Sequence, residues 1–309
     1  MLTGSQQGLD FVSRCLLDPG DAVIMDRPGY LGAIQTFRAA GVHIVGWDAV
    51  RADPEELEDL IQRYRPKLLY TNPTFHNPTG RTLSLETRKE ILALAARYRL
   101  PILEDEPYRD LSFRTAPPPT LFELDEQSLV IHLTTFSKTL AAGLRLGWLA
   151  APEAVIDQLT LVKQRSDLFG AGAFQLVVAE LLERGLYDAH LRTLRAAHAE
   201  RYAAMTAALE SLLPRGMLTW SPVNGGIYLW AHARPNIDAQ RLAQRALDAG
   251  LALVSGDVFF PDGAGWHDLR LCFARNPAPV IAIGVERLAN LLTTAEAHPL
   301  REGSTHPLM

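Results

Sequence analysis

The sequence has little of the residues that build cross-linked, membrane-spanning or nucleic-acid-binding proteins. Its 309 residues include only two cysteines, Cys15 and Cys272, which cannot form a disulfide framework. No stretch offers about 20 consecutive apolar residues, and the first residues lack the pattern of a secretion signal. Lys and Arg number 30 against 35 Asp and Glu, which gives a net charge of −5 without a basic patch. We therefore expect a cytoplasmic protein without direct nucleic-acid or membrane contacts.

The composition is that of a folded globular protein of more than one domain. Hydrophobic residues make up 48% and charged residues 21%, with 22 Gly and 20 Pro, which excludes a disordered, collagenous or coiled-coil chain. At about 150 residues per domain, the length predicts two domains with a cleft between them. Such a cleft suits an enzyme.

Residues 5–150 alternate between short apolar runs and amphipathic stretches, which predicts β-α units and a mostly parallel sheet. Helices are expected after Asp53-Pro54 and after the N-cap Ser84. The last two strands follow each other without a helix, so one edge of the sheet is expected to depart from the parallel pattern. The expected strands are 22–26, 43–47, 67–72, 101–105, 129–136 and 144–151.

Beyond residue 151 the pattern changes to long Ala/Leu/Arg-rich helices and then to a smaller α+β unit. The longest helix is expected from Leu186 to Leu213. Strands 218–223 and 226–233 flank a hairpin turn at Asn224-Gly225-Gly226, and a helix over 238–249 follows. Two strands, 251–255 and 269–274, and a terminal helix over 279–297 complete the unit. We therefore predict an α/β large domain over 1–190 and a small domain over 191–309.

Lys138 is the most informative residue of the chain, which contains four lysines beside 26 arginines. It follows an apolar strand, among hydroxyl residues and without an acidic neighbour in sequence. A lysine in such a place loses its proton readily and can attack an aldehyde, which is the basis of covalent lysine catalysis. A surface lysine in a loop explains this segment equally well.

The segment EDEPY places Asp105 at the end of a buried strand and Tyr108 three residues later. A carboxylate there is able to hold a protonated ring nitrogen, and the phenol to reach a ring hydroxyl. The alternative is a helix N-terminus with acidic first-turn residues, which is the favoured interpretation for Glu106 and a weaker one for Asp105.

Two further segments carry polar groups to the same edge of the sheet. Gly4, Ser5 and Gln6 lie at a predicted helix N-terminus, which attracts phosphate, although serine is also a common N-cap. In FHNPTG, Pro78 holds Asn77 in a turn, for which ordinary turn geometry is an equal explanation. The hydroxyls and guanidinium that join the proposed phosphate site belong to Thr135, Ser137 and Arg145.

In this order and spacing, the segments resemble the fold-type I pyridoxal-phosphate (PLP) enzymes of the class I/II aminotransferase family. The resemblance runs from residue 1 to about 295 and is strongest to 2-aminoadipate (LysN-type) and kynurenine aminotransferases. It rests on GSQQGLD, DRPGYLGA, PTFHNPTG, EDEPYRDL, TFSKTLAAGLRLGW, NGGIYLW and LRLCFA. It implies PLP as cofactor and no metal.

The resemblance also implies a role for each candidate residue. Lys138 binds the aldehyde of PLP covalently, Asp105 pairs with the ring nitrogen, and Tyr30 stacks on the ring. Tyr108 and Asn77 bond the phenolic oxygen, and Arg270 binds the substrate carboxylate, rather than an acidic neighbour such as Asp268. The phosphate ligands are Ser5, Gln6, Thr135, Ser137 and Arg145.

The implied reaction moves the amino group of an L-α-amino acid, of 2-aminoadipate, aromatic or branched type, to 2-oxoglutarate in a homodimer. Two departures from the family pattern bear on this. The chain starts where a preceding segment usually covers the site, so we expect weaker PLP binding and slower turnover than in a version extended upstream. Phe169-Gly170 stands where relatives often carry a His-Pro or Thr-Pro turn near the dimer interface.

The rival hypothesis is the PLP-binding effector domain of a MocR-type transcription regulator, which would require a DNA-binding segment before residue 1.

Overall fold

The computed structural model describes residues 1–48 and 50–297 and contains two sheets. The larger sheet has six strands in the order β2-β1-β3-β4-β5-β6. The first five strands pair in parallel, whereas β6 runs antiparallel to β5, as the sequence predicts for one edge. These strands are β1 (Ala22–Arg27), β2 (His43–Asp48), β3 (Leu68–Thr71), β4 (Ile102–Asp105), β5 (Val130–Thr135) and β6 (Gly147–Ala150). Strand β6 begins later than predicted because Ala142–Leu144 form the short 3-10 helix η2.

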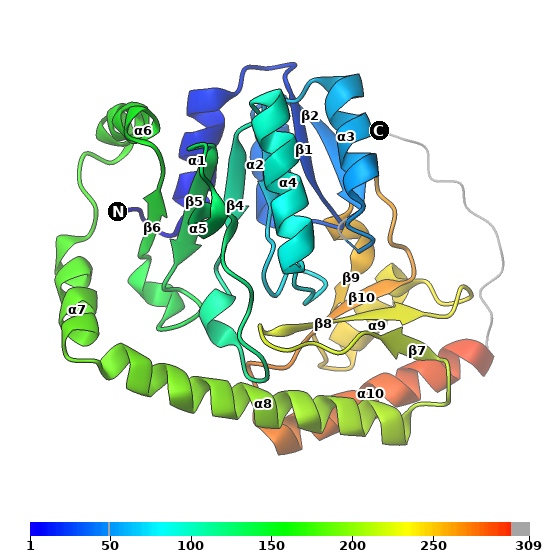
Figure 1. Ribbon diagram of the computed structural model, residues 1–309. Helices are drawn as coiled ribbons and strands as arrows, with labels where there is room; N and C mark the ends of the chain where they lie inside the picture. Colours follow the sequence, from blue (N-terminus) through cyan, green and yellow to red (C-terminus); the bar gives the residue numbers. More distant parts are fainter. Residues whose placement is uncertain (49, 298–309) are drawn as a thin grey trace.

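Helices cover both faces of the large sheet, and each face has its own apolar core (Figure 1). On one face, α1, α2 and α6 bury side chains such as Leu9, Phe37 and Leu159. On the other, α3, α4 and α5 bury Leu57, Ile91 and Leu121. The helices are α1 (Ser5–Leu16), α2 (Leu31–Ala39), α3 (Pro54–Tyr64), α4 (Leu85–Tyr98), α5 (Leu121–Leu124) and α6 (Glu153–Ser166).

Two predicted helix starts are confirmed in atomic detail. The Asp53 side chain accepts a hydrogen bond from the backbone N–H of Glu55, and Pro54 occupies the first turn of α3. The Ser84 hydroxyl accepts a bond from the N–H of Thr87 at the start of α4. These caps satisfy backbone donors that the first turn of a helix leaves free.

The smaller sheet has four antiparallel strands in the order β7-β8-β10-β9. These are β7 (Leu218–Trp220), β8 (Tyr228–Ala233), β9 (Val254–Ser255) and β10 (Asp268–Cys272), with η3 (Gly256–Phe259) directly after β9. The predicted hairpin is confirmed as the antiparallel pair β7 and β8, but its short turn at Asn224-Gly225-Gly226 is wrong, because a seven-residue connection, 221–227, joins the two strands. That connection packs against the larger domain, where Gly225 forms a bridge with Ser112 and lies against Phe75. The strand predicted over 251–255 shortens to Val254 and Ser255, which pair with Arg270 and Leu269 of β10.

Two long helices, α8 and α10, and the shorter α9 pack on the small sheet, and α8 runs past both parts of the molecule (Figure 1). Helix α8 buries Tyr202, Met205 and Leu209 in one core with the small sheet, α9 and α10. The remaining elements are α7 (Gly172–Glu183), α8 (Leu186–Leu212), α9 (Ala239–Asp248), α10 (Ala278–Ala297) and η1 (Arg109–Leu111). The predicted domain boundary at residue 190 falls inside α8 and stays a prediction. Across the described residues, no helix combines the length and apolar character that crossing a bilayer requires.

Candidate active site

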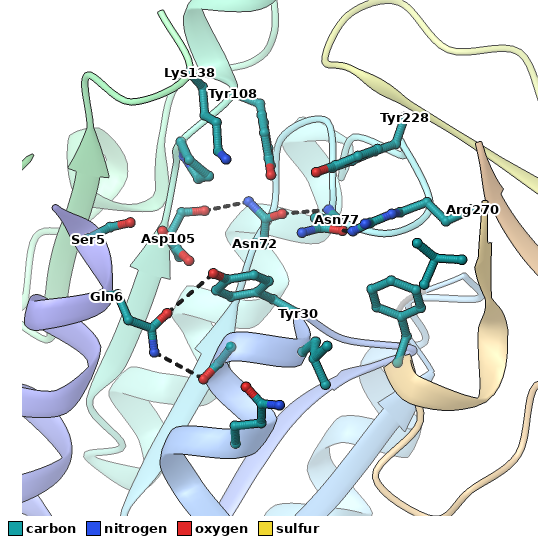
Figure 2. A pocket seen from close by; sticks show the side chains of 16 residues that line it. Ser5, Gln6, Tyr30, Asn72, Asn77, Asp105, Tyr108, Lys138, Tyr228 and Arg270 are labelled. Carbon is teal, nitrogen blue, oxygen red and sulfur yellow. Dashed lines mark hydrogen bonds between the residues drawn. The ribbon is translucent and has the colours of Figure 1, made fainter. Parts of the chain in front are cut away.

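A cavity of about 620 Å³ lies where the carboxyl ends of the parallel strands face β8 and β10. This is the edge at which open α/β sheets bind ligands. Figure 2 shows that its side chains come from both parts of the molecule. The predicted site residues that line it are Ser5, Gln6, Tyr30, Asn77, Asp105, Tyr108, Lys138 and Arg270. The tertiary structure thus brings together segments that lie up to 265 positions apart, from Ser5 to Arg270.

Asp105 ends β4 and presents a carboxylate that is only partly satisfied. The residue is 3% exposed, and its Oδ2 accepts a 2.9 Å hydrogen bond from the hydroxyl of Tyr70 on β3. Its Oδ1 is buried and has no hydrogen-bond partner among the described residues. Burial raises the pKa of Asp105 to about 6, against the opposing effect of the Tyr70 bond. A buried acceptor without a donor is costly, so this oxygen fits a site for a cationic N–H group.

Lys138 follows β5 and points into the same part of the cavity as Asp105 and Tyr108 (Figure 2). The surrounding protein lowers the pKa of its ammonium, first through desolvation and then through the positive charge of Arg270. Among the described residues no salt bridge pairs its Nζ, although the side chain lies near Asp105. An amine with a lowered pKa is a better nucleophile and proton acceptor at neutral pH.

Tyr108 lies between the large sheet and the small one. Its ring is buried and packs edge-on against Tyr228 of β8, with the ring centroids 5.8 Å apart. Burial, followed by the interaction with Tyr228, raises the pKa of the Tyr108 phenol well above its usual value. The hydroxyl therefore keeps its proton and acts as a hydrogen-bond donor in the cavity.

Tyr30 and Gln6 form a hydrogen-bonded wall on the α1 side of the cavity. The Tyr30 hydroxyl donates to Gln6 Oε1 at 3.2 Å, and Gln6 Nε2 donates to the Thr36 hydroxyl at 2.8 Å. Burial and the nearby Asp105 carboxylate raise the pKa of Tyr30 to about 12. Tyr30 precedes α2, which fixes its backbone. Its ring faces the cavity opposite Asp105 (Figure 2).

The guanidinium of Arg145 lies where α1 begins, together with two hydroxyl groups. Gly4 has φ +78°, and a Cβ there would lie 2.5 Å from Nη2 of Arg145, so the guanidinium lies directly against the helix N-terminus. Arg145 Nη1 donates to the Ser137 hydroxyl at 3.3 Å, and the Ser137 and Thr135 hydroxyls are 2.9 Å apart. Thr135 also bonds the carbonyl of Leu146, so its hydroxyl holds the turn beside the cavity. The helix N-cap is Gly4, and Ser5 has no capping role.

Arg270 reaches from β10 to the loop that carries Asn77. Its Nη1 donates to Asn77 Oδ1 at 2.8 Å. The guanidinium lies 4.1 Å from the ring centroid of Tyr228 and 4.7 Å from that of Phe259, so its orientation is fixed by two aromatic faces. The acidic neighbour Asp268 pairs with His232 instead.

Four further residues, which the sequence patterns did not predict as site residues, shape the site. Asn72, at the end of β3, and Tyr228 line the cavity, Phe259 stacks on Arg270, and Tyr70 bonds Asp105. Asn72 ends the run KLLYTN, and a polar residue closing an apolar strand was the available signal. Tyr70 gave no signal, because a tyrosine within a buried strand normally reports only on packing.

The helix-start interpretation of Glu106 is wrong. The backbone after β4 forms no α-helix at this point, and the Glu106 side chain is buried. Its Oε1 accepts a 2.6 Å bond from Thr74 and lies 3.6 Å from Arg88. Arg88 is wholly buried and contacts Glu104 as well, so these residues form a buried cluster of one guanidinium and two carboxyl groups. Burial and the nearby Glu104 raise the pKa of Glu106 to about 8.

The comparison with protein families identifies the class of protein that this fold and cavity define. The sequence model described as aminotransferase class I and II matches residues 1–288. The chain therefore belongs to the class I and II aminotransferase family, and it is a PLP-dependent aminotransferase with the fold-type I architecture.

Particular relatives agree with this assignment. The chain is 37% identical to a 2-aminoadipate transaminase of Thermus thermophilus, over 94% of this chain and 74% of the relative. The crystal structure of LysN, an α-aminoadipate aminotransferase of the same species complexed with N-(5′-phosphopyridoxyl)-L-leucine, superposes with a TM-score of 0.92 at 36% identity. That match covers 96% of this chain and 77% of LysN. The chain is also 32% identical to the HTH-type transcriptional regulator YisV of Bacillus subtilis, over 94% of this chain and 60% of the regulator.

The residues present in the cavity fit PLP. Asp105, whose Oδ1 has no partner among the described residues, and Lys138, which follows β5, both line the cavity (Figure 2). The N-terminus of α1 and Arg145 together make an electropositive corner that suits a phosphate. A base, a carboxylate and an anion site are thus arranged around one space, which matches the aldehyde, ring nitrogen and phosphate of this cofactor.

Proposed function

We propose that this chain transfers the amino group of an L-α-amino acid, of 2-aminoadipate, aromatic or branched type, to 2-oxoglutarate. The observation that carries the proposal is that Lys138, Asp105 and Arg270 line one cavity. An amine, a buried carboxylate and a planar cation are the groups that amino transfer on a pyridine ring requires. The relationship to a 2-aminoadipate transaminase supports the donor class.

Asp105 and Lys138 carry the chemical step in this proposal. PLP, when bound, supplies an electron-accepting ring and an aldehyde. The Asp105 carboxylate holds the proton on the ring nitrogen by a charge-assisted hydrogen bond, for which its free Oδ1 is available. The Lys138 amine, with its lowered pKa, would take the proton from the α-carbon of the substrate and return it to the carbon that carries the aldehyde oxygen in free PLP.

The other residues hold the reactants in place. Tyr30 covers one face of the ring, and the Tyr108 hydroxyl and the Asn77 amide bind the phenolic oxygen. The phosphate is bound by Ser5, Gln6, Thr135, Ser137 and Arg145. The hydrogen bonds among Arg145, Ser137 and Thr135 support this grouping.

Arg270 binds the α-carboxylate of the substrate. Its guanidinium is stacked between Tyr228 and Phe259 and already bonds an amide oxygen of Asn77, so its orientation is set before substrate arrives. A planar fork that is held in advance binds a carboxylate bidentately with little loss of rotamer freedom. Asn77 lies close enough to contact the same carboxylate.

A second candidate function is that of a PLP-binding effector domain in a transcription regulator. The similarity to YisV favours it, because that match covers 94% of this chain, as does the match to the 2-aminoadipate transaminase. The two functions differ in turnover. An enzyme completes amino transfer to an oxo acid repeatedly, whereas an effector domain needs only to bind the cofactor and an amino acid.

The deciding experiment records the absorbance spectrum of the PLP-loaded protein with a panel of L-amino acids, followed by 2-oxoglutarate. For an aminotransferase of this specificity, 2-aminoadipate, aromatic or branched amino acids convert the spectrum, and 2-oxoglutarate restores it with formation of glutamate. A spectrum that changes with amino acid but yields no oxo acid over many equivalents would favour the effector-domain function.

We further propose that the chain acts as a cytoplasmic homodimer. Its two cysteines are free, which suits a reducing compartment. Large apolar side chains around α7 are exposed, with Leu168 at 70%, Phe169 at 86% and Leu176 at 74%. Exposed apolar surface of this extent favours association, and two-fold dimers are the commonest assembly. Light scattering coupled to size exclusion tests the dimer, and Phe169→Ser together with Leu176→Ser should shift it toward monomer.

A further inference from the structure

Asn72 uses both ends of its side-chain amide to join two segments of the site (Figure 2). The residue follows β3 and is 3% exposed. Its Nδ2 donates a 2.5 Å hydrogen bond to the backbone carbonyl of Asp105, and its Oδ1 accepts a 2.7 Å bond from the backbone N–H of Asn77. The amide is therefore a bridge between the end of β4 and the loop after β3.

The backbone of Asn72 is fixed as well. Its N–H donates a 2.7 Å bond to Oδ2 of Asp26, which lies at the end of β1 and is almost fully buried. The backbone and side chain of Asn72 together thus connect three neighbouring parallel strands, β1, β3 and β4. An amide held on both sides has a single orientation, because its donor and acceptor cannot be exchanged without breaking both bonds.

The two segments that Asn72 joins carry different parts of the proposed chemistry. Asp105 presents its side chain to the ring nitrogen, whereas Asn77 is bonded to Arg270, which receives the substrate carboxylate. The distance between these groups sets where the α-carbon lies relative to the ring. A displacement of about 1 Å in such an arrangement is enough to cost roughly a hundredfold in rate.

We propose that Asn72 is a positioning residue that fixes Asp105 relative to the Asn77–Arg270 pair. The proposal rests on the roles assigned above to Asp105 and Arg270. Asn72 does not itself react. It holds the loop that anchors Arg270 at the place where a bound amino acid meets the cofactor ring, through two buried hydrogen bonds that no other side-chain type forms in the same way.

The test compares Asn72→Leu with Thr71→Val in the PLP-loaded enzyme. Leucine has the same branched arrangement of side-chain heavy atoms as asparagine, although it is larger, and it makes neither bond. Thr71 is the adjacent buried residue, and its hydroxyl donates a 3.0 Å bond to Oδ1 of Asp26 rather than to Asp105 or Asn77. Thr71→Val therefore removes a buried hydrogen bond from the same strand without removing the bridge. The readouts are KM and kcat for amino acid and oxo acid, and amide hydrogen exchange at Asn77.

For Asn72→Leu, we expect KM for both substrates to rise about tenfold and amide exchange at Asn77 to accelerate about tenfold. The reason is that losing one buried hydrogen bond changes an equilibrium constant by about that factor. Thr71→Val should lower thermal stability and leave KM and the exchange at Asn77 unchanged. A folded Asn72→Leu enzyme with wild-type KM and wild-type exchange would overturn the proposal. So would an equal rise in KM in both variants.

If Asn72→Leu does not fold, Asn72→Ser replaces it, because a serine hydroxyl is too short to reach both partners. The same rises in KM and exchange support the proposal, and their absence overturns it. Asp105→Asn and Arg270→Lys are measured in parallel. If Asp105→Asn and Arg270→Lys lose activity but the residue 72 variant keeps wild-type KM and exchange, the positioning role alone is refuted. If all three variants keep wild-type turnover, the site assignment and the positioning role are refuted together.

Discussion

The guanidinium of Arg270 donates a 2.8 Å hydrogen bond to the side-chain oxygen of Asn77, which lies 193 positions earlier in the chain. The bond connects β10 of the small sheet to the loop after β3 of the large one. It places a cation from one part of the molecule next to the carboxylate and amine supplied by the other, and the three groups line a single cavity.

Replacing Arg270 by lysine is expected to weaken substrate binding selectively. A lysine ammonium cannot reproduce the planar fork or stack in the same way between Tyr228 and Phe259. Loss of a hydrogen bond to a charged group costs about 1.5 to 3 kcal/mol, so the KM of the amino acid should rise about 10- to 150-fold. Titration with PLP provides the control, since cofactor affinity should stay within about twofold. Equal losses of substrate and cofactor affinity would mean that Arg270 is structural.

Lys138 is expected to be the residue that PLP modifies. Reduction of the loaded enzyme with borohydride, followed by peptide mass analysis, should place the pyridoxyl group on Lys138. The other lysines, Lys67, Lys89 and Lys163, lie outside the cavity and serve as internal controls. An adduct on any of them would refute the assignment. Lys138→Arg should keep the fold and give no reducible adduct.

Asp105→Asn is expected to abolish most of the activity while preserving the fold. The amide still accepts the hydrogen bond that Tyr70 donates to Oδ2 of the carboxylate, but it carries no charge to hold a proton on the ring nitrogen. We expect kcat to fall by two or more orders of magnitude, which corresponds to about 2.7 kcal/mol or more of barrier. Single-turnover kinetics with one amino acid measure the step directly. Near-normal rates would show that another group pairs with the ring nitrogen.

The same substitution should stabilise the cofactor-free protein, with a defined pH dependence. Burial raises the pKa of Asp105 from 3.8 to about 6, so the folded state holds this proton more tightly than the unfolded state. The charged carboxylate therefore penalises the folded state above pH 6, by about 3 kcal/mol, and the penalty fades as the pH falls toward 4. Thermal melts should show the variant above the wild type at pH 7.5 and level with it near pH 4. A constant difference at both pH values would refute the linkage.

Arg88 is expected to be needed for stability rather than for chemistry. Its buried guanidinium lies 3.6 Å from Glu106 and 3.8 Å from Glu104, and it donates to the carbonyl of Pro73. Arg88→Met leaves two buried carboxyls without their cation, which typically costs about 3 to 5 kcal/mol. Denaturant unfolding measures the loss.

Glu106→Gln is the matched control for Arg88→Met. Because the pKa of Glu106 is raised to about 8, this carboxyl is largely protonated at pH 7, and glutamine resembles its protonated form. The control should lose much less stability than Arg88→Met at that pH. Equal losses in the two variants would show that the cluster depends on a charged Glu106.

Local sequence patterns determined much of the architecture. The alternation of apolar runs and amphipathic stretches predicts the parallel strands β1 to β5, and the helix starts at Asp53 and Ser84 follow from capping chemistry, which acts within three residues. The polar residues that close the strands, such as Asp105, can also be recognised as candidate site residues from the sequence, because parallel strands present their carboxyl ends at one edge of the sheet.

Only the tertiary structure decided the properties that depend on contacts distant in sequence. Glu106 looks like a helix start until Arg88 is seen to be buried beside it, and the hairpin predicted at Asn224 opens into a longer connection because Gly225 packs against Phe75. Tyr70 gives no chemical signal in the sequence, and Asn72 signals only a polar strand end. Each acquires its role from Asp105 on the next strand, 35 and 33 positions away respectively. Periodicity and capping report on neighbours within a few residues, whereas burial, pKa and hydrogen-bond partners are set by the surfaces that folding brings together.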